Sequence, residues 1–135
     1  MRNTIVISLY RILFGFPAPI ILALLINELT NVKFKRTVQT ISYLPHFISV
    51  VIMAGIIKNI LSLNGPVNYI VKVLGGTPTL FLTSTRYFRS ILVASGIYSS
   101  VGWGSIIYLA AMSNVNPELY EAAIADGAGR FRRIW

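Results

Sequence analysis

Two long stretches without any Asp, Glu, Lys or Arg limit what this chain can fold into. They cover residues 37–57 and residues 90–117 and are 21 and 28 residues long. A helix needs about 20 predominantly apolar residues to cross the hydrocarbon core of a bilayer, so either stretch is long enough to span it. A third uncharged stretch, residues 12–27, becomes long enough if it extends back to Ile5 and if Arg11 snorkels or faces protein.

The composition supports a membrane-embedded chain. Only 12% of the 135 residues are charged and the mean hydropathy is +0.69, whereas soluble domains are about 25% charged. We therefore predict an all-α integral membrane protein with three spanning helices, at about residues 3–26, 38–57 and 88–112. The net charge of +8 does not indicate nucleic-acid binding, because the basic residues flank the apolar stretches. The absence of cysteine excludes a disulfide framework and a thiolate metal site.

Turn-forming residues predict where the helices bend and how they are connected. Pro17 and Pro19 lie near the middle of the first span, where they remove backbone donors and force a kink or a break. Such a break either faces other helices or a pathway, or is a structural kink only. The polar residues 27–36 predict a loop, and helical spacing of apolar residues over 67–74 predicts a short interfacial helix. His46 is a lone histidine, to which we assign neither a metal nor a proton relay.

The third span carries small residues on one face and three large aromatic residues. Gly96, Ser100 and Gly104 recur at every fourth position, and small residues in a membrane helix let another helix approach closely. This pattern predicts a helix-packing face. The aromatic residues are either packing and interfacial groups or candidate sugar contacts in a substrate pathway, and they are Tyr98, Trp103 and Tyr108.

The polar segment after the third span has the form of a short docking helix. Asn116 fits the N-cap position, Pro117 fits the first helical position, and Gly127 can adopt the left-handed conformation that ends a helix. A helix over residues 117–126 would be about 15 Å long, which is too short to cross a membrane. Its alanines and acidic residues are typical either of an ordinary surface helix or of a helix that docks into a basic groove of another protein.

The same segment resembles the shared loop of the membrane-spanning permease subunits of binding-protein-dependent ABC importers. That loop contains Glu-Ala-Ala and then Asp-Gly-Ala, which stand here at residues 121–123 and 126–128. Further motifs resemble the oligosaccharide and polysaccharide uptake branch of the family, at residues 16–19, 24–28, 43–47, 64–66, 102–104 and 114–117. The resemblance implies one partial MetI-like permease domain over residues 1–135, with the C-terminal helices of the fold missing.

The resemblance also implies roles and partners. The loop forms a cytoplasmic coupling helix that docks on a separate ATPase subunit, and the residues carried over to this role are Glu121, Ala122, Ala123, Asp126 and Gly127. The implied partners are that ATPase, which binds ATP and Mg²⁺, a second permease subunit, an extracellular solute-binding protein, the sugar and membrane lipids. The chain itself is expected to bind no cofactor, metal or nucleic acid. It is expected to lie in the cell membrane as a multi-pass protein.

We therefore predict a permease subunit of an ATP-driven oligosaccharide importer, and not an enzyme. The alternative is a truncated membrane-embedded interaction or assembly fragment with no transport activity alone. An enzyme acting on glycans would need two facing carboxylates. Three of the four acidic residues lie in the terminal segment, and the four are Glu28, Glu118, Glu121 and Asp126. The sequence also has no Walker A motif, so ATP hydrolysis by this chain is not expected.

Overall fold

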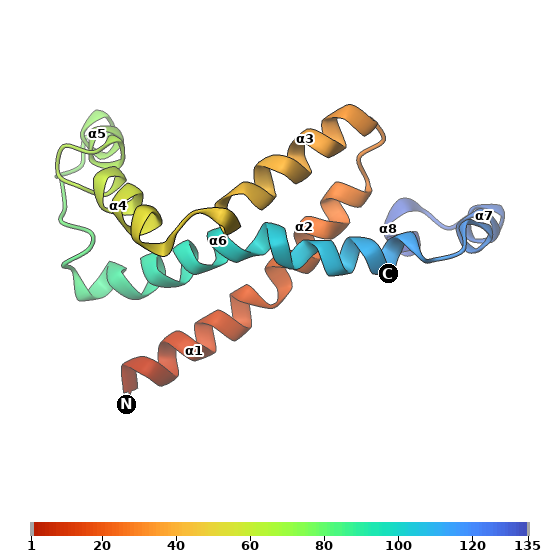
Figure 1. Ribbon diagram of the computed structural model, residues 1–135, viewed down its shortest axis with the longest axis horizontal. Coiled ribbons are helices and arrows are strands. Elements are labelled where there is room, and N and C mark those ends of the chain that lie inside the picture. The colour runs from red at the N-terminus through yellow and green to blue at the C-terminus, as the bar shows by residue number, and fades with distance from the viewer. Residues whose placement is uncertain (1, 135) are drawn as a thin grey trace.

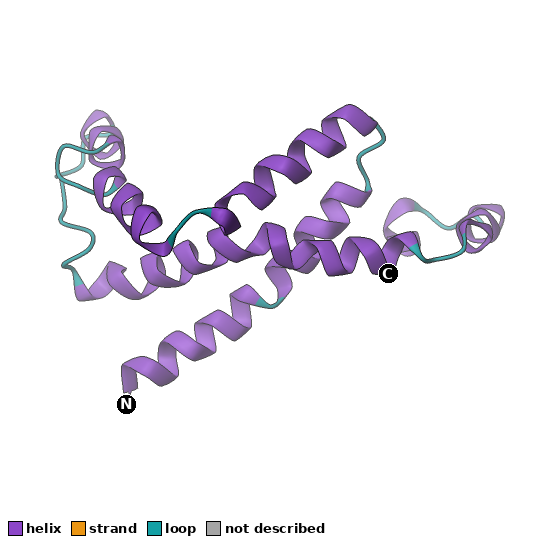
Figure 2. Cartoon of the chain, in the orientation of Figure 1, coloured by secondary structure: helices purple, strands orange, loops and turns teal. Residues whose placement is uncertain are grey.

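The computed structural model describes residues 2–134, which form packed helices without any strand in that range (Figures 1 and 2). The helices α1 (Arg2–Gly15) and α2 (Pro17–Asn27) together make a 26-residue apolar span. The span is interrupted at Phe16, immediately before the two prolines, although the Phe16 amide still donates to the carbonyl of Ile12 at 3.2 Å. The interruption lies where the prolines predicted a break.

The second uncharged stretch is not one straight helix. The helix α3 (Val32–Tyr43) continues into the 3-10 helix η1 (Leu44–Phe47), and α4 (Val50–Ile60) then leaves at 104° to the preceding helical segment. Residues 48 and 49 have ψ angles of 130° and 139°, so the backbone is extended there and the helical hydrogen bonding stops. The structure therefore differs from the straight helix expected over residues 38–57, and this stretch crosses a membrane only as a bent pair.

The start of α3 also differs from the loop expected over residues 27–36. The side chain of Asn31 accepts a hydrogen bond from the amide of Phe34 at 3.1 Å and thereby caps the helix. The basic residues Lys33, Lys35 and Arg36 consequently lie in the first turns of α3. Their polarity indicated an aqueous position, which a helix beginning outside the bilayer also provides.

One buried side chain organises the connection between α4 and α6. The connection contains α5 (Pro66–Val73), the short helix expected there. Asn68 is completely buried, and its Nδ2 atom donates to the carbonyls of Ser62 and Thr79 at 2.9 and 3.0 Å. Its Oδ1 atom accepts from the amide of Thr79 at 2.8 Å. These three bonds join two ends of the connection that are distant in sequence.

The longest helix, α6 (Thr85–Ser113), runs through the centre of the chain (Figure 1). It packs most extensively against α2 and also contacts α1, α3 and η1. The hydrophobic core lies mainly between α2 and α6. Its buried residues are Ala23, Ile26 and Leu109, and the side chains packed against them are Leu22, Val38, Tyr108 and Met112.

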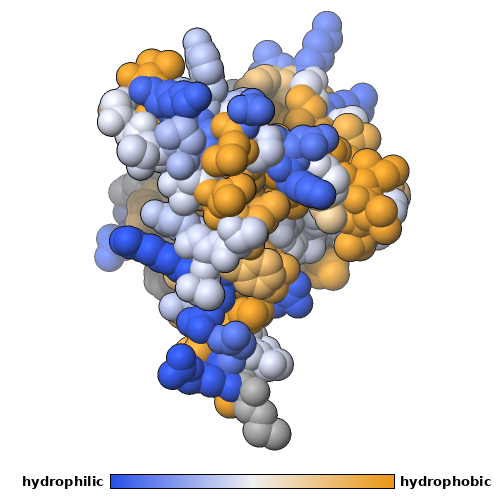
Figure 3. Space-filling view, turned by 90° about the vertical axis from the view of Figure 1, so that its left-hand side faces the viewer, coloured by the Kyte–Doolittle hydropathy of each residue, from blue (hydrophilic) through white to orange (hydrophobic). Residues whose placement is uncertain are grey.

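Most large apolar side chains point away from this core. Val50, Val51 and Leu74 expose 83%, 80% and 80% of their surface. Figure 3 shows hydrophobic side chains interleaved with hydrophilic ones on the face seen from the α4 and α5 end of the molecule. Apolar surface of this extent is expected where lipid or another membrane subunit covers it. The structure has two spans long enough to cross a bilayer, at Arg2–Asn27 and Thr85–Ser113, and a third if the bent pair is one span.

Candidate functional site

The helix α7 (Pro117–Ala125) begins with a side-chain cap from Asn116. The Oδ1 atom of Asn116 accepts a hydrogen bond from the amide of Glu118 at 3.0 Å, and its Nδ2 atom donates to Glu118 Oε2 at 3.2 Å. Pro117 occupies the first helical position, where its missing donor leaves no helical hydrogen bond unmade. The carboxylate of Glu118 also lies near the positive end of the helix dipole. Local interactions therefore define the start of this nine-residue helix.

The end of α7 is closed by two backbone hydrogen bonds around Gly127. The amide of Gly127 donates to the carbonyl of Ile124 at 3.0 Å, and the amide of Ala128 donates to the carbonyl of Ala123 at 2.9 Å. This pair of bonds is the Schellman motif, and it needs a left-handed residue at the position of Gly127, whose φ is +76°. A side chain at this position would strain the turn that sets the direction in which the chain leaves α7.

The predicted coupling residues lie on an uncovered surface of α7 and its exit turn. Of the helix itself, no residue is buried, and the apolar Leu119 exposes 63% of its surface. Packing against this chain therefore contributes little to α7, and the helix leaves a surface of small and acidic side chains uncovered. Most of the predicted residues are exposed on it, namely Glu121, Ala122, Asp126 and Gly127, while Ala123 is half-buried.

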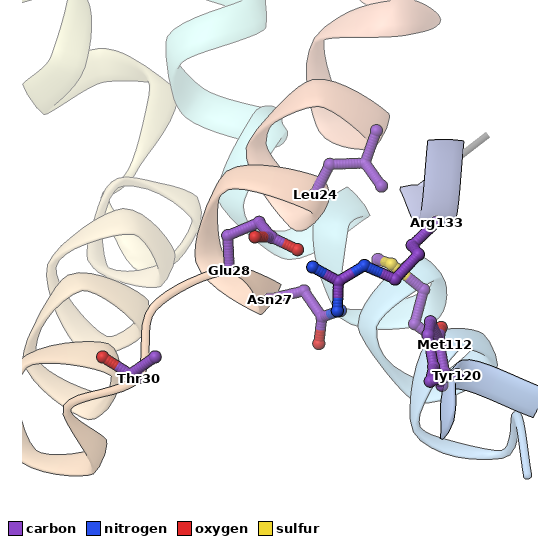
Figure 4. Close-up of a pocket in the computed structure, with 7 residues that line it drawn as sticks. All are labelled: Leu24, Asn27, Glu28, Thr30, Met112, Tyr120 and Arg133. Carbon is purple, nitrogen blue, oxygen red and sulfur yellow. The ribbon is translucent and has the colours of Figure 1, made fainter. Parts of the chain in front are cut away.

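A cavity of about 370 Å³ separates α7 and α8 (Arg130–Ile134) from the C-terminal ends of α2 and α6 (Figure 4). Figure 4 shows Glu28 and Arg133 on opposite sides of it, pointing toward one another, with Tyr120 of α7 beside Arg133. The Nε atom of Arg133 is buried and has no hydrogen-bond partner among residues 2–134. The sequence analysis did not identify this cavity, because its residues are brought together only by the packing of α2 and α6.

Two of the three residues predicted to form a packing face contact the first span. A methyl group built on Gly104 would lie 3.2 Å from Cγ of Pro19, and one built on Gly96 would lie 3.5 Å from Nη2 of Arg11. Ser100 is exposed, and its hydroxyl donates to the carbonyl of Gly96 at 2.9 Å. The structure thus places both glycines beside α1 and α2 and leaves the serine open.

Among the glycines of α6, the one most closely approached by another helix is Gly102, on the other side of α6. A methyl group built there would overlap the backbone carbonyl of Ser42 on α3. At about 100° per residue, Gly102 points roughly 160° away from Gly104, so α6 lies between the first span and α3. Ser105, one turn further on, is fully buried and donates to the carbonyl of Gly102 at 2.6 Å. This face was not predicted from the sequence. Its only signal there is the spacing of three small or apolar residues, Gly102, Ser105 and Leu109.

The three aromatic residues proposed for a substrate pathway do not form one cluster. Trp103 stacks on His46 with ring centroids 4.8 Å apart and planes 5° from parallel, and it meets Phe47 edge-on at 5.6 Å. Tyr108 packs against the hydrophobic core, and Tyr98 exposes 59% of its surface. The stacking contact with Trp103 gives His46 a structural role. Within the described range, no three side chains of His, Cys, Asp or Glu are grouped as a metal site requires.

A second cavity, of about 430 Å³, lies between α1, η1, α4 and α6. Its wall is apolar on the α4 side, where Met53 and Ile57 contribute, and polar on the side of α1 and α6. A cavity of this size with a few convergent polar groups is typical of sites for small ligands. The polar lining residues are Arg11, His46, Ser95, Ser99 and Ser100.

The sequence matches known proteins over nearly its whole length. A profile of the family described as binding-protein-dependent transport system inner membrane component matches residues 15–135. Protein LplB of Bacillus subtilis (strain 168) is 44% identical, and the match covers all of this chain and 43% of that protein. The polygalacturonan/rhamnogalacturonan transport system permease protein YteP of the same strain is 42% identical, over all of this chain and 42% of that protein. The chain therefore spans less than half the length of these relatives.

The fold matches solved structures equally well. A bacterial ABC transporter involved in the import of the acidic polysaccharide alginate contains a chain that superposes with a TM-score of 0.96 and 47% identity. The match covers 99% of this chain and 47% of that one. A bacterial alginate ABC transporter in complex with an alginate pentasaccharide-bound periplasmic protein gives the same values. The helices described above are therefore arranged as in part of an ABC importer permease.

Proposed function

Because this chain belongs to the family of binding-protein-dependent transport system inner membrane components, we propose that it forms part of the permease subunit of an ATP-driven oligosaccharide importer. In this proposal α7 couples the permease to a separate ATPase subunit. The observation that carries the proposal is that the Glu-Ala-Ala and Asp-Gly residues of the family's loop stand on a capped helix without buried residues. Such a helix is available for docking.

The remaining partners follow from the same family. ATP and Mg²⁺ would bind to the ATPase subunit, while a second permease subunit would complete the membrane pathway. An extracellular solute-binding protein would deliver the sugar, and the structure of the alginate transporter with a periplasmic protein supports this part. YteP, a polygalacturonan/rhamnogalacturonan permease, and the alginate transporter with its pentasaccharide-bound periplasmic protein support oligosaccharides as the substrate class.

The arrangement of α6 and α7 gives the coupling a physical route. A connection of three residues, 114–116, separates the two helices, and the amides of Asn114 and Val115 donate back to the end of α6 at 3.2 and 3.3 Å. An uninterrupted helix of 29 residues is about 44 Å long and moves as a stiff element. A displacement of α7 by the ATPase would therefore reach the contacts of α6 with the first span and with α3.

Each residue of the docking surface has a role that follows from its chemistry. Glu121 supplies a negative charge for an Arg or Lys in the receiving groove. Ala122 and Ala123 let the backbone of α7 approach the groove closely. Asp126 ends the helix, and Gly127 sets the exit turn through its left-handed backbone.

The test uses the full-length permease expressed with its ATPase, second permease and binding protein. We expect Glu121→Lys, and separately Gly127→Asp, to abolish co-purification of the ATPase and sugar uptake. The first reverses the docking charge and the second strains the exit turn. Lys72→Glu is the matched control, because it reverses an exposed charge on α5, far from α7. Wild-type ATPase recruitment and uptake in both α7 variants would refute the coupling role.

A further inference from the structure

Arg11 is a charged residue in the interior of a membrane span. It lies nine residues after the start of the span Arg2–Asn27, which is about 14 Å along the helix axis and well inside a hydrocarbon core of about 30 Å. On insertion scales an arginine near a helix centre costs about 2.5 to 3.5 kcal/mol. Such residues mark functional sites by default when they face protein or a water-filled cavity.

Within residues 2–134, no acidic side chain is placed to neutralise Arg11. The acidic residue nearest to Arg11 in the sequence is Glu28, which lies about 25 Å away along the axis of the first span. The other three follow α6 in the terminal segment. The guanidinium is a permanent cation, so it carries its charge into this region without a carboxylate from residues 2–134 beside it.

The guanidinium of Arg11 is directed at α6. Its Nη2 and Nε atoms lie 3.5 and 3.9 Å from the position of a methyl group built on Gly96. The glycine therefore leaves the planar group open beside the helix, where a longer side chain would cover it. Arg11 also lines the cavity of about 430 Å³, so its donors are accessible from that space.

The other polar residues of this cavity suit a sugar. The hydroxyls of Ser95 and Ser100 donate to the carbonyls of Leu92 and Gly96 at 3.0 and 2.9 Å, which leaves their oxygen lone pairs free to accept from sugar hydroxyls. His46, stacked on Trp103, lines the cavity near Pro45. The cavity thus combines hydrogen-bond acceptors for hydroxyl groups with one permanent cation.

We propose that Arg11 binds the carboxylate of an acidic sugar unit as it passes through this cavity, so that the importer is selective for saccharides containing uronic acids. A guanidinium presents two parallel N–H donors that match the two oxygens of a carboxylate. A neutral sugar would leave this cation without a partner in a region of low dielectric constant. The inference rests on the proposed transport function, and it adds the residue and the charge class of the substrate.

The experiment measures uptake by the complete importer in proteoliposomes loaded with ATP. The probes are trisaccharides of galacturonate and of mannuronate, each beside its methyl ester, which keeps the ring and removes the charge. We expect Arg11→Gln to lower uptake of the acidic probes by about 10- to 100-fold, the size expected for a hydrogen bond between charged groups, and to leave ester uptake unchanged. Arg11→Lys keeps the charge and should give intermediate values, and it decides the question if Arg11→Gln fails to assemble.

The control is Arg86→Gln, because Arg86 is exposed at the first turn of α6 and lies outside the cavity. It should transport both classes of probe as the wild type does. Equal losses of acidic and esterified probes in the Arg11 variants would mean that Arg11 is structural or pairs with another subunit, and would overturn the inference. If the wild-type importer took up the esters but not the acidic probes, the inference would also be overturned, while the transport function would stand. A complex that hydrolyses ATP but imports none of the probes, nor any neutral oligosaccharide, would instead count against the proposed function.

Discussion

A single methyl group added to α6 distinguishes the packing surface seen in the structure from the one expected from the sequence. The perturbation is a series of Gly→Ala substitutions in one helix, at Gly96, Gly102 and Gly104, in the full-length permease. All three exchanges gain the same helix propensity, at most about 1 kcal/mol, so this contribution cancels within the series. What differs is the neighbour that the new methyl group meets.

The contacts give the order and the approximate size of the effects. At Gly102 the methyl group overlaps the backbone carbonyl of Ser42, and relief requires α3 to move as a whole. Overpacking of this kind costs about 1 to 3 kcal/mol or more, so we expect a net loss of about 2 kcal/mol. At Gly104 the neighbour is the ring of Pro19 at 3.2 Å, which can shift slightly, and the expected change is within about 1 kcal/mol of zero. At Gly96 the nearest atom is 3.5 Å away, an ordinary contact, and stability should be unchanged or slightly increased.

The assay is SDS-induced unfolding of the purified protein, followed by circular dichroism, with the free energy of unfolding compared across the series. Gly55→Ala on α4 is the control, because beyond its own turn of helix no atom of the described chain lies within 4 Å of a methyl group built there. The reasoning would be refuted if Gly104→Ala destabilised the protein as much as or more than Gly102→Ala. That result would make the face expected from the every-fourth-residue pattern the tighter one.

Two further substitutions test the local structure outside the membrane spans. Asn68→Ala removes the hydrogen-bond partner of two loop carbonyls and of the Thr79 amide. Each group left unsatisfied in a buried position costs about 1 to 3 kcal/mol, so hydrogen exchange at the Thr79 amide should accelerate strongly. The control Asn64→Ala should leave that exchange rate unchanged. Asn116→Ala removes the N-cap of α7 at a cost of about 0.5 to 2 kcal/mol. It should increase hydrogen exchange in the first turn of α7 and weaken ATPase co-purification. Asn116→Asp retains a capping oxygen and should keep the wild-type exchange rate and co-purification.

The features that the sequence predicted well depend on residues close together in the chain. The break before Pro17 follows from the missing donors of two prolines, and the start of α7 follows from an asparagine and a proline in adjacent positions. The left-handed backbone at Gly127 follows from the one residue type that adopts it without strain. Each of these is a statement about one turn of backbone, so no knowledge of tertiary contacts was needed.

The bend between α3 and α4 shows where such reasoning stops. Residues 37–57 contain no Asp, Glu, Lys or Arg, and an uncharged stretch of this length predicts one straight spanning helix. The structure instead ends the helical hydrogen bonding after η1 and turns the chain by 104°. Pro45 is the eighth residue of the expected helix, where a proline removes a helical hydrogen bond, so it could have indicated an interruption but not the angle of the turn.

The glycines of α6 show the same limit for tertiary structure. An isolated sequence pattern can identify a face rich in small residues, but it cannot say which face another helix approaches most closely. Gly102 lies opposite the repeated face and was not part of the pattern, yet among the glycines of α6 it is the one where a neighbouring backbone excludes any side chain. A helix held between two neighbours needs small residues on both sides, and the sequence shows the second side only as one glycine, one serine and one leucine at spacings of three and four. Gly96 has a different role, because the space left by its missing side chain is occupied by the Arg11 guanidinium. The same residue type therefore brings two helices together at one position of α6 and keeps a charged group accessible at another.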